Sequence, residues 1–242
     1  MSRYYCHEYP DVLVLETQVI DTRPGGVLLA QSPFHPGGGG QLADRGLVRW
    51  NGGEVRVTGM ETVDGRHWHL LAEPVEITGT VETVVNAEFR SMMEQLHTDT
   101  HILNALVFRQ FHGALVTGAQ LNEDGTARMD FDLPDADNDR LRALEPEINE
   151  VICQDLPVRY AYVPAADAAA EPGLVRNRSV APPPAEDGTV RLVEIVGLDR
   201  QACGGTHLAS TGRSQGVRVL KIDNKGRHNR RVKIGLTGAP RA

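Results

Sequence analysis

The chain has 242 residues and a net charge of −7, and its 40% apolar and 24% charged residues are typical of a globular protein. No uncharged apolar run approaches the roughly 18 residues of a membrane span, and the first eight residues lack the apolar core of a secretory signal. Three cysteines cannot form a disulfide framework, so we expect a reducing, cytoplasmic location. Composition therefore excludes fibrous, disordered, membrane and secreted proteins.

The first 85 residues predict a small antiparallel sheet or barrel. Short runs of alternating apolar residues recur about every ten residues between Gly-rich turns, which is typical of small barrels. Strands are expected at residues 12–20, 27–30, 46–50, 54–60, 67–70 and 75–81. We therefore expect a β-rich N-terminal domain over residues 1–85, which contains the Gly-rich run Phe34–Gln41.

The composition changes near residue 86. Residues 86–112 contain no Gly or Pro and carry apolar residues at helical spacing, so they predict a long helix. A second helix is expected from about residue 134 to residue 154, with an interruption at Pro146. Residues 164–190, rich in Ala, Pro and Gly, predict a loop. Further strands are expected at residues 115–121, 127–133, 158–163, 190–196, 217–222 and 231–236. These elements predict an α+β domain over residues 86–242.

Positive charge is concentrated at the C-terminal end. From Arg213 onward the chain has nine Lys and Arg residues and one acidic residue, Asp223. An acidic body with a basic end indicates a polyanionic partner, although a solvated Arg-rich hairpin explains the same pattern equally well.

Two pairs of His and Cys residues suggest a metal site. His97 and His101 are four residues apart on the first predicted helix, so their imidazoles share one face. Cys203 and His207 are also four apart, and the two glycines between them permit a tight loop. Three imidazoles and a thiolate suit tetrahedral zinc, although each pair alone is also compatible with core packing. Position 98 is Thr, so the His-Glu-x-x-His motif of zinc proteases does not apply.

These motifs resemble the editing domain of alanyl-tRNA synthetase. Residues 97–103, His-Thr-Asp-Thr-His-Ile-Leu, resemble its first zinc motif, residues 203–208 its second, and residues 34–41 its upstream Gly-rich motif. The C-terminal run at residues 221–232 also fits. Because the chain has no room for an aminoacylation domain, it is similar to the free-standing editing proteins of the AlaX family, in their medium-length form.

Three departures from the family pattern stand out. His35 replaces the usual Tyr, which suggests an additional ligand or an altered substrate pocket. Asp99 replaces a small residue, and we expect it to be solvated on the helix face rather than to act as a base or to support a His ligand. The run Arg213–Gln215 replaces Glu-Ile-Gly after the second zinc motif. None of the three removes an expected metal ligand.

The resemblance implies an α+β fold in which a small β-barrel-like N-terminal domain precedes an editing domain. That domain is of the threonyl/alanyl-tRNA synthetase second-additional-domain type. It implies an ATP-independent hydrolase that removes serine, and by extension glycine, from the acceptor end of tRNA(Ala). One Zn²⁺ per chain would be held by His97, His101, Cys203 and His207. Two alternatives stay open: editing of another tRNA such as seryl-tRNA(Thr), and a zinc-structured tRNA-binding module without catalysis.

The resemblance also implies roles for individual residues. Thr98 and Gln41 are the catalytic candidates that would sense the seryl hydroxyl, because a site that requires a hydroxyl can reject alanine by roughly 10⁴. A helical back-bond for Thr98 and a turn-capping amide for Gln41 are the structural alternatives. Zinc would either activate water and polarise the ester or, with four protein ligands, only orient the substrate. The substrate-binding candidates are Gly38, Gly39, Gly40 and Thr206. The candidates for tRNA phosphate contacts are Lys221, Lys225, Arg227, Arg230 and Arg231.

Overall fold

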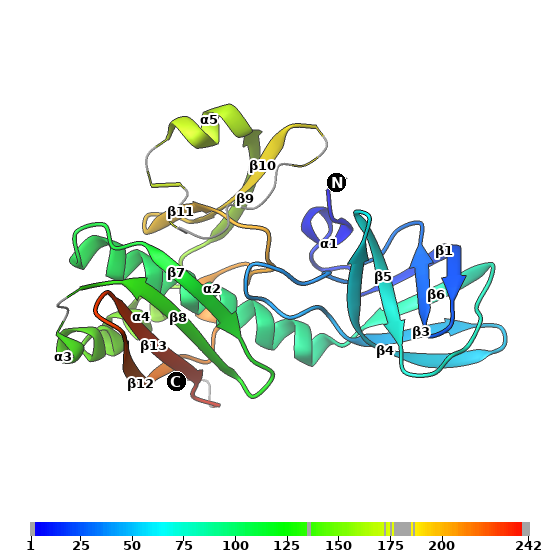
Figure 1. The fold of residues 1–242 in the computed structure, drawn as a ribbon, viewed down its shortest axis with the longest axis horizontal. Coiled ribbons are helices and arrows are strands. Elements are labelled where there is room, and N and C mark those ends of the chain that lie inside the picture. The colour runs from blue at the N-terminus through cyan, green and yellow to red at the C-terminus, as the bar shows by residue number, and fades with distance from the viewer. Residues whose placement is uncertain are drawn as a thin grey trace. The chain divides into compact units, whose positions relative to one another are not determined.

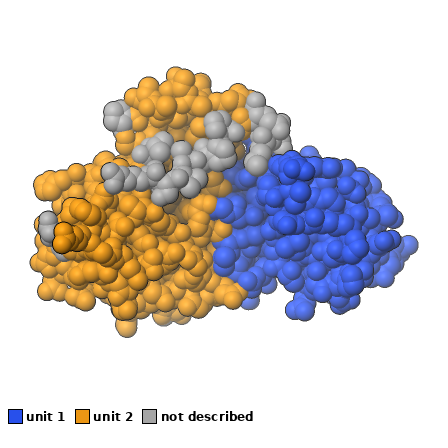
Figure 2. Space-filling view, viewed as in Figure 1, with its two compact units in different colours: residues 1–38, 42–91 blue, residues 39–41, 92–242 orange. Residues whose placement is uncertain are grey.

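The computed structural model describes residues 3–134, 137–171, 173–174, 176, 185 and 187–238. The chain forms two compact units, coloured separately in Figure 2. Unit 1 comprises residues 1–38 and 42–91, and unit 2 comprises residues 39–41 and 92–242. The change of unit falls within one long helix, and the domain boundary that we predict at residue 85 stays a prediction. The predicted α+β class is confirmed.

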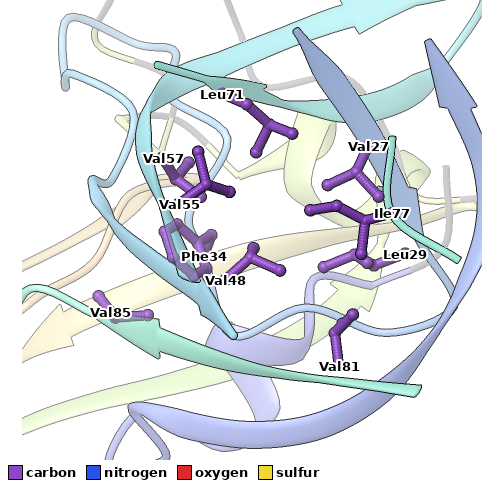
Figure 3. Close-up of a cluster of buried hydrophobic side chains, with 10 residues drawn as sticks. All are labelled: Val27, Leu29, Phe34, Val48, Val55, Val57, Leu71, Ile77, Val81 and Val85. Atoms are coloured by element: carbon purple, nitrogen blue, oxygen red, sulfur yellow. The ribbon is translucent and has the colours of Figure 1, made fainter. Parts of the chain in front are cut away.

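Unit 1 contains a closed six-stranded barrel, as the sequence predicts. A short helix, α1 (Tyr5–Glu8), precedes the strands (Figure 1). The strands are β1 (Val14–Arg23), β2 (Gly26–Leu29), β3 (Gly46–Trp50), β4 (Gly53–Val63), β5 (Arg66–Leu71) and β6 (Thr80–Val85). They pair in the order β1-β2-β5-β4-β3-β6. The buried apolar side chains converge on the barrel interior, as Figure 3 shows: Val27, Leu29, Phe34, Val48, Val55, Val57, Leu71, Ile77, Val81 and Val85.

The last strand of the barrel begins five residues later than predicted. The alternation from Val75 to Val81 favours a strand, yet β6 begins at Thr80. Pro74 cannot donate a backbone hydrogen bond at one end of this stretch, and Gly79 has a φ of +80° at the other. The stretch between them is therefore outside the sheet, although Ile77 is still fully buried in the barrel core.

The start of the Gly-rich motif is held in place within unit 1 by a buried ion pair, Asp44 and Arg90. Asp44 accepts hydrogen bonds from the His35 backbone N–H at 2.6 Å and from the Arg90 guanidinium, whose Nε lies 3.0 Å from Oδ2. Arg90 also donates to the Pro33 carbonyl at 2.8 Å, so the buried charges satisfy each other and the local backbone. At Gly46, a Cβ would lie 2.0 Å from the carbonyl oxygen of Val84, which explains a glycine at that position.

Unit 2 contains two antiparallel sheets and most of the helices. The four-stranded sheet has the order β12-β13-β8-β7, and the three-stranded sheet has the order β11-β10-β9. The strands are β7 (Val116–Leu121), β8 (Thr126–Asp132), β9 (Val158–Pro164), β10 (Thr189–Ile195), β11 (Asp199–Ala202), β12 (Val217–Lys225) and β13 (Asn229–Leu236). The long helix α2 (Ala87–Gln110) confirms the first predicted helix. Among the described residues, no helix combines the length and apolar character needed to cross a membrane.

Two predictions for unit 2 need correction. The second predicted helix is two helices, α3 (Asn138–Arg142) and α4 (Leu144–Cys153), which separate at Ala143 rather than at Pro146. Pro146 lies in the first turn of α4, where its missing N–H has no intrahelical partner to lose.

The predicted loop at 164–190 contains the helix α5 (Ala165–Ala170), which lies against the three-stranded sheet in Figure 1. Ala168 of α5 is buried with Val190 and Leu192 of β10. Residues 172, 175, 177–184 and 186 of that loop lie outside the described residues.

Candidate metal centre

The four predicted metal ligands converge in unit 2. His97 and His101 are one turn apart on α2, and Cys203 and His207 lie in the segment between β11 and the 3₁₀ turn Thr211–Arg213. Their ligand atoms all lie within 4.8 Å of one another. The Cys203 Sγ is 3.4 Å from the His97 Nε2 and 3.3 Å from the His207 Nε2. Such a group can hold one metal ion, and its three imidazoles and one thiol are donors that suit zinc.

The outer ring nitrogens of two ligands are held by other side chains. The His97 Nδ1 lies 2.8 Å from the Gln41 Oε1, and the His207 Nδ1 lies 3.3 Å from the Thr98 Oγ1. Both rings therefore direct Nε2 toward the centre of the cluster. Metal-binding imidazoles commonly donate their second N–H to an oxygen in this way, which fixes the ring orientation. This arrangement is a second observation, besides the ligand types, that fits a metal.

The electrostatic environment leaves two of the four side chains, His101 and Cys203, uncharged before a metal binds. Burial lowers the pKa of His101 to about 4, and the nearby positive charges of Arg191 and Arg176 act in the same direction. Burial raises the pKa of the Cys203 thiol, while the Arg191 charge opposes that shift. At neutral pH the His101 imidazole is therefore ready to coordinate, whereas Cys203 would lose its proton to water when its sulfur binds a cation.

Gln41 reaches the cluster through a backbone conformation that only glycine adopts easily. Gly40 has a φ of +94°, and a Cβ there would lie 2.6 Å from the Ala119 carbonyl oxygen. Gln41 then bridges the two metal motifs. Its Oε1 accepts from the Thr206 backbone N–H at 3.0 Å, and its Nε2 donates to the Thr206 Oγ1 at 2.8 Å. Gly38 and Gly39 also have positive φ, and a Cβ at either position would meet no atom within 4 Å among the described residues.

Arg191 contacts the candidate site, and nothing in the sequence predicts this. It lies on β10, is half-buried, and donates from Nη1 to the carbonyl oxygens of Cys203 at 3.0 Å and Gly205 at 2.9 Å. One guanidinium thus anchors the turn that carries two metal ligands. A single Arg in a predicted strand has no sequence signal for this role, because the contact depends on how the turn folds back onto the strand.

The expectation that Asp99 is solvated on the helix face is wrong. Asp99 is fully buried rather than solvated, and burial raises its pKa to about 7. The Ser214 hydroxyl donates to its Oδ2 at 2.8 Å, and Oδ1 has no hydrogen-bond partner among the described residues. Two departures from the family pattern, a carboxylate on the helix and a hydroxyl after the second zinc motif, therefore contact each other. The departures from the family pattern at Asp99 and Ser214 are therefore coupled rather than independent.

This pairing predicts a non-additive effect on stability. Replacing Ser214 with alanine is expected to destabilise the protein by about 1–3 kcal/mol, because Asp99 would be buried without a donor. The double variant Asp99→Ala/Ser214→Ala should recover a large part of that loss, since removing both partners leaves no unsatisfied carboxylate. Urea unfolding of the two single variants and the double variant measures the coupling. Additive effects would contradict a direct interaction between the two side chains.

The basic residues at the C-terminal end lie on the β12–β13 hairpin. Arg231 makes two hydrogen bonds of 2.7 Å to Asp130, and Arg230 is 9% exposed. The Lys221 ammonium is 2.8 Å from Asp223. Lys225 and Arg227 are exposed and have no ion-pair partner in the described part of the chain. The five residues thus differ in how available they are, and their contact with tRNA stays a prediction.

His35 does not join the metal cluster. It lies in unit 1 with 1% of its surface exposed, and its Nδ1 accepts a hydrogen bond from the Gly37 backbone N–H at 3.1 Å. Within the described ranges, the only group of His, Cys and acidic residues arranged to hold a metal is the one in unit 2. The suggestion of an additional ligand at His35 therefore finds no support in the structure.

Comparisons with known proteins find one matching family model and several similar proteins. The family model of the threonyl and alanyl tRNA synthetase second additional domain matches residues 190–233, which include Cys203 and His207. The alanyl-tRNA editing protein AlaX-M of Methanosarcina mazei is 34% identical over 87% of this chain and 86% of its own length. AlaX-M of Saccharolobus solfataricus is 33% identical over 90% and 91%. The alanine–tRNA ligase of Caldivirga maquilingensis is 34% identical over 81% of this chain but only 22% of its own length.

Proposed function

Because this chain belongs to the AlaX-M family of alanyl-tRNA editing proteins, we propose that it hydrolyses the ester that joins serine to the terminal ribose of tRNA(Ala). The reaction needs water and no ATP, and the tRNA substrate makes the cytoplasm the expected location. The convergence of His97, His101, Cys203 and His207 beside Gln41 and Thr98 is the observation that carries the proposal. Glycine on tRNA(Ala) would also be removed at this site, but more slowly than serine, because glycine has no side-chain hydroxyl.

The metal in this proposal is one Zn²⁺ per chain. The four converging side chains would hold it, with the thiolate of Cys203 as the one anionic ligand. When bound, zinc supplies Lewis-acid chemistry that stabilises negative charge developing on the ester carbonyl oxygen. Gln41, Thr98 and Arg191 keep the ligands in position through the hydrogen bonds described above.

Selection for serine would come from two hydrogen-bond donors, one on Thr98 and one on Gln41, that have no partner within the described part of the site. With Nε2 of His207 on the metal, the neutral ring carries its hydrogen on Nδ1 and donates it to the Thr98 Oγ1. That oxygen also accepts from the Leu208 backbone N–H at 3.1 Å. Both lone pairs of Thr98 are then used, and its own O–H remains to donate. Gln41 likewise keeps one amide hydrogen after its bond to Thr206. We propose that these two donors bind the seryl hydroxyl.

The remaining contacts in the proposal concern the tRNA. Gly38, Gly39, Gly40 and Thr206 would line the approach of the aminoacyl ester, because a backbone without Cβ atoms admits close contact. Lys221, Lys225 and Arg227 would contribute phosphate contacts, which are independent of sequence and weaken with salt. Arg230 and Arg231 would contribute phosphate contacts as well, but smaller ones, because Arg230 is buried and Arg231 is paired to Asp130.

Deacylation of seryl-, glycyl- and alanyl-tRNA(Ala) by the purified protein tests the proposal. We expect serine to be removed at least roughly a hundredfold faster than alanine, because an alanyl ester leaves the two donors unpaired. The measurement is the initial rate of amino-acid release for each substrate, with and without a chelator. Binding of tRNA without release of serine would indicate a zinc-structured module instead. Equal or faster release from seryl-tRNA(Thr) would indicate the other editing reaction.

A pair of threonine variants provides the matched control. Thr98→Val should lower the ratio of seryl to alanyl deacylation by about tenfold or more, since it removes a hydrogen bond to the substrate hydroxyl. Thr98→Ser should retain the ratio. Thr100→Val alters the same helix, but the Thr100 hydroxyl already donates to the His97 carbonyl at 2.7 Å, so the ratio should not change. An unchanged ratio in Thr98→Val would overturn the assignment of Thr98.

A further inference from the structure

An exposed aromatic ring and a guanidinium lie side by side on the three-stranded sheet of unit 2. Tyr160 on β9 pairs with Val193 on β10, so Arg191, two residues from Val193, shares the face of Tyr160. The Arg191 Cζ lies 5.2 Å from the centre of the Tyr160 ring. Tyr160 is 45% exposed, which is high for an aromatic side chain in a strand. Apart from its contact with Arg191, packing among the described residues therefore leaves nearly half of the Tyr160 side chain uncovered.

The opposite face of the same sheet has its own core. Val190 and Leu192 alternate with Arg191 along β10 and are buried with Ala168 of α5 and Leu174. The sheet is thus stabilised on the α5 side, and Tyr160 does not contribute to that cluster. Among the described residues, the exposed part of its ring is open to contact with another molecule.

Arg191 connects this ring directly to the metal centre. The same guanidinium that contacts Tyr160 donates to the carbonyl oxygens of Cys203 and Gly205. The Gly205 backbone N–H in turn lies 3.4 Å from the Cys203 Sγ. Tyr160 is therefore separated from the turn that carries the metal ligands by a single side chain. A molecule that reacts at the metal centre and extends along Arg191 would meet the Tyr160 ring.

We propose that Tyr160, supported by Arg191, is the stacking platform for an unpaired base at the acceptor end of the bound tRNA. The inference rests on the proposed function, in which the reacting ester is attached to the terminal ribose. The base on that ribose must then lie within one nucleotide of the metal centre. Aromatic rings and guanidinium groups stack on unpaired bases irrespective of base identity, which suits an end that all tRNA molecules share. The positive charge of Arg191 also favours the adjoining phosphates.

A fluorescent base analogue tests the stacking directly. The probe is an uncharged acceptor-stem RNA whose terminal adenine is replaced by 2-aminopurine, a base whose emission is quenched on stacking. We expect quenching on binding to the unaltered protein, retention of quenching in Tyr160→Phe, and its loss in Tyr160→Ala and Tyr160→Leu. Tyr9→Ala is the matched control, because Tyr9 is 51% exposed and lies in unit 1. It should leave the quenching unchanged.

Kinetics with seryl-tRNA provide the second readout. Tyr160→Ala should raise KM about 5- to 100-fold and leave both kcat and the zinc content unchanged, the range that base stacking on an aromatic ring supports. Unchanged KM and unchanged quenching in Tyr160→Ala would overturn the platform while leaving the hydrolase intact. If the unaltered protein released no serine but still quenched the probe through Tyr160, the proposed function would fail and the platform would stand.

Discussion

Replacing Cys203 with alanine is expected to abolish both metal retention and deacylation. Its thiol is the only ligand in the group that becomes negatively charged, because the other three ligands are neutral imidazoles. Without it, the four converging atoms lose the charge that offsets a divalent cation. We expect bound zinc to fall well below one ion per chain. Seryl-tRNA deacylation should fall by about a thousandfold or more, equivalent to ~4 kcal/mol of lost Lewis-acid stabilisation.

Metal analysis and single-turnover deacylation on the same preparation measure the two effects together. Cys153→Ala is the matched control, since Cys153 is an exposed free cysteine on α4 and should leave both quantities unchanged. Binding of uncharged tRNA to Cys203→Ala separates loss of chemistry from loss of fold, because phosphate contacts on the β12–β13 hairpin do not require the metal. A Cys203→Ala protein that kept its zinc and its rate would show that the thiol is not a ligand.

The convergence of His97, His101, Cys203 and His207 could be predicted because the signal for each pair is local. Zinc restricts ligands to few residue types, and the spacing of four between His97 and His101 already defines one face of a helix. The pair Cys203 and His207 carries a similar local signal. The barrel could be predicted for the same reason, since strand alternation and Gly-rich turns are visible within ten residues. The late start of β6 could not be predicted, because Ile77 follows the alternation of a strand but packs in the barrel core without backbone pairing to a neighbouring strand.

The residues that escaped prediction act through contacts between distant segments. Considered on its helix alone, Asp99 is expected to be solvated. It is buried because the loop that carries Ser214 packs over it. Arg191 is an ordinary strand residue until the ligand-bearing turn folds over it. Gln41 is a predicted site residue, but its contact with His97, 56 positions away, has no local signal either. Such pairs have no sequence periodicity, so a single chain contains no pattern that would reveal them.

Gly205→Ala is expected to lower zinc affinity by roughly a hundredfold or more, although it adds only a methyl group. A Cβ at this position would lie 2.0 Å from the His97 Cε1, 2.2 Å from the His97 Nδ1 and 2.6 Å from the Gln41 Oε1. The methyl group cannot be accommodated unless the turn or the His97 ring moves. Either movement displaces Cys203 relative to His97, whose ligand atoms are now 3.4 Å apart. Competition with a chromophoric chelator measures the affinity.

The glycine in this turn therefore has a role beyond the one that the sequence suggests. The two glycines predict a tight loop between two ligands, and the structure adds a close approach of the Gly205 backbone to the ring of His97. Gly59→Ala is the control for a Gly-to-Ala change as such, because a Cβ at Gly59 would meet no described atom within 4 Å and its φ is not positive, so zinc affinity should stay unchanged. If the close approach did not matter, Gly205→Ala would keep nearly full affinity, since alanine restricts the backbone by only about 1 kcal/mol.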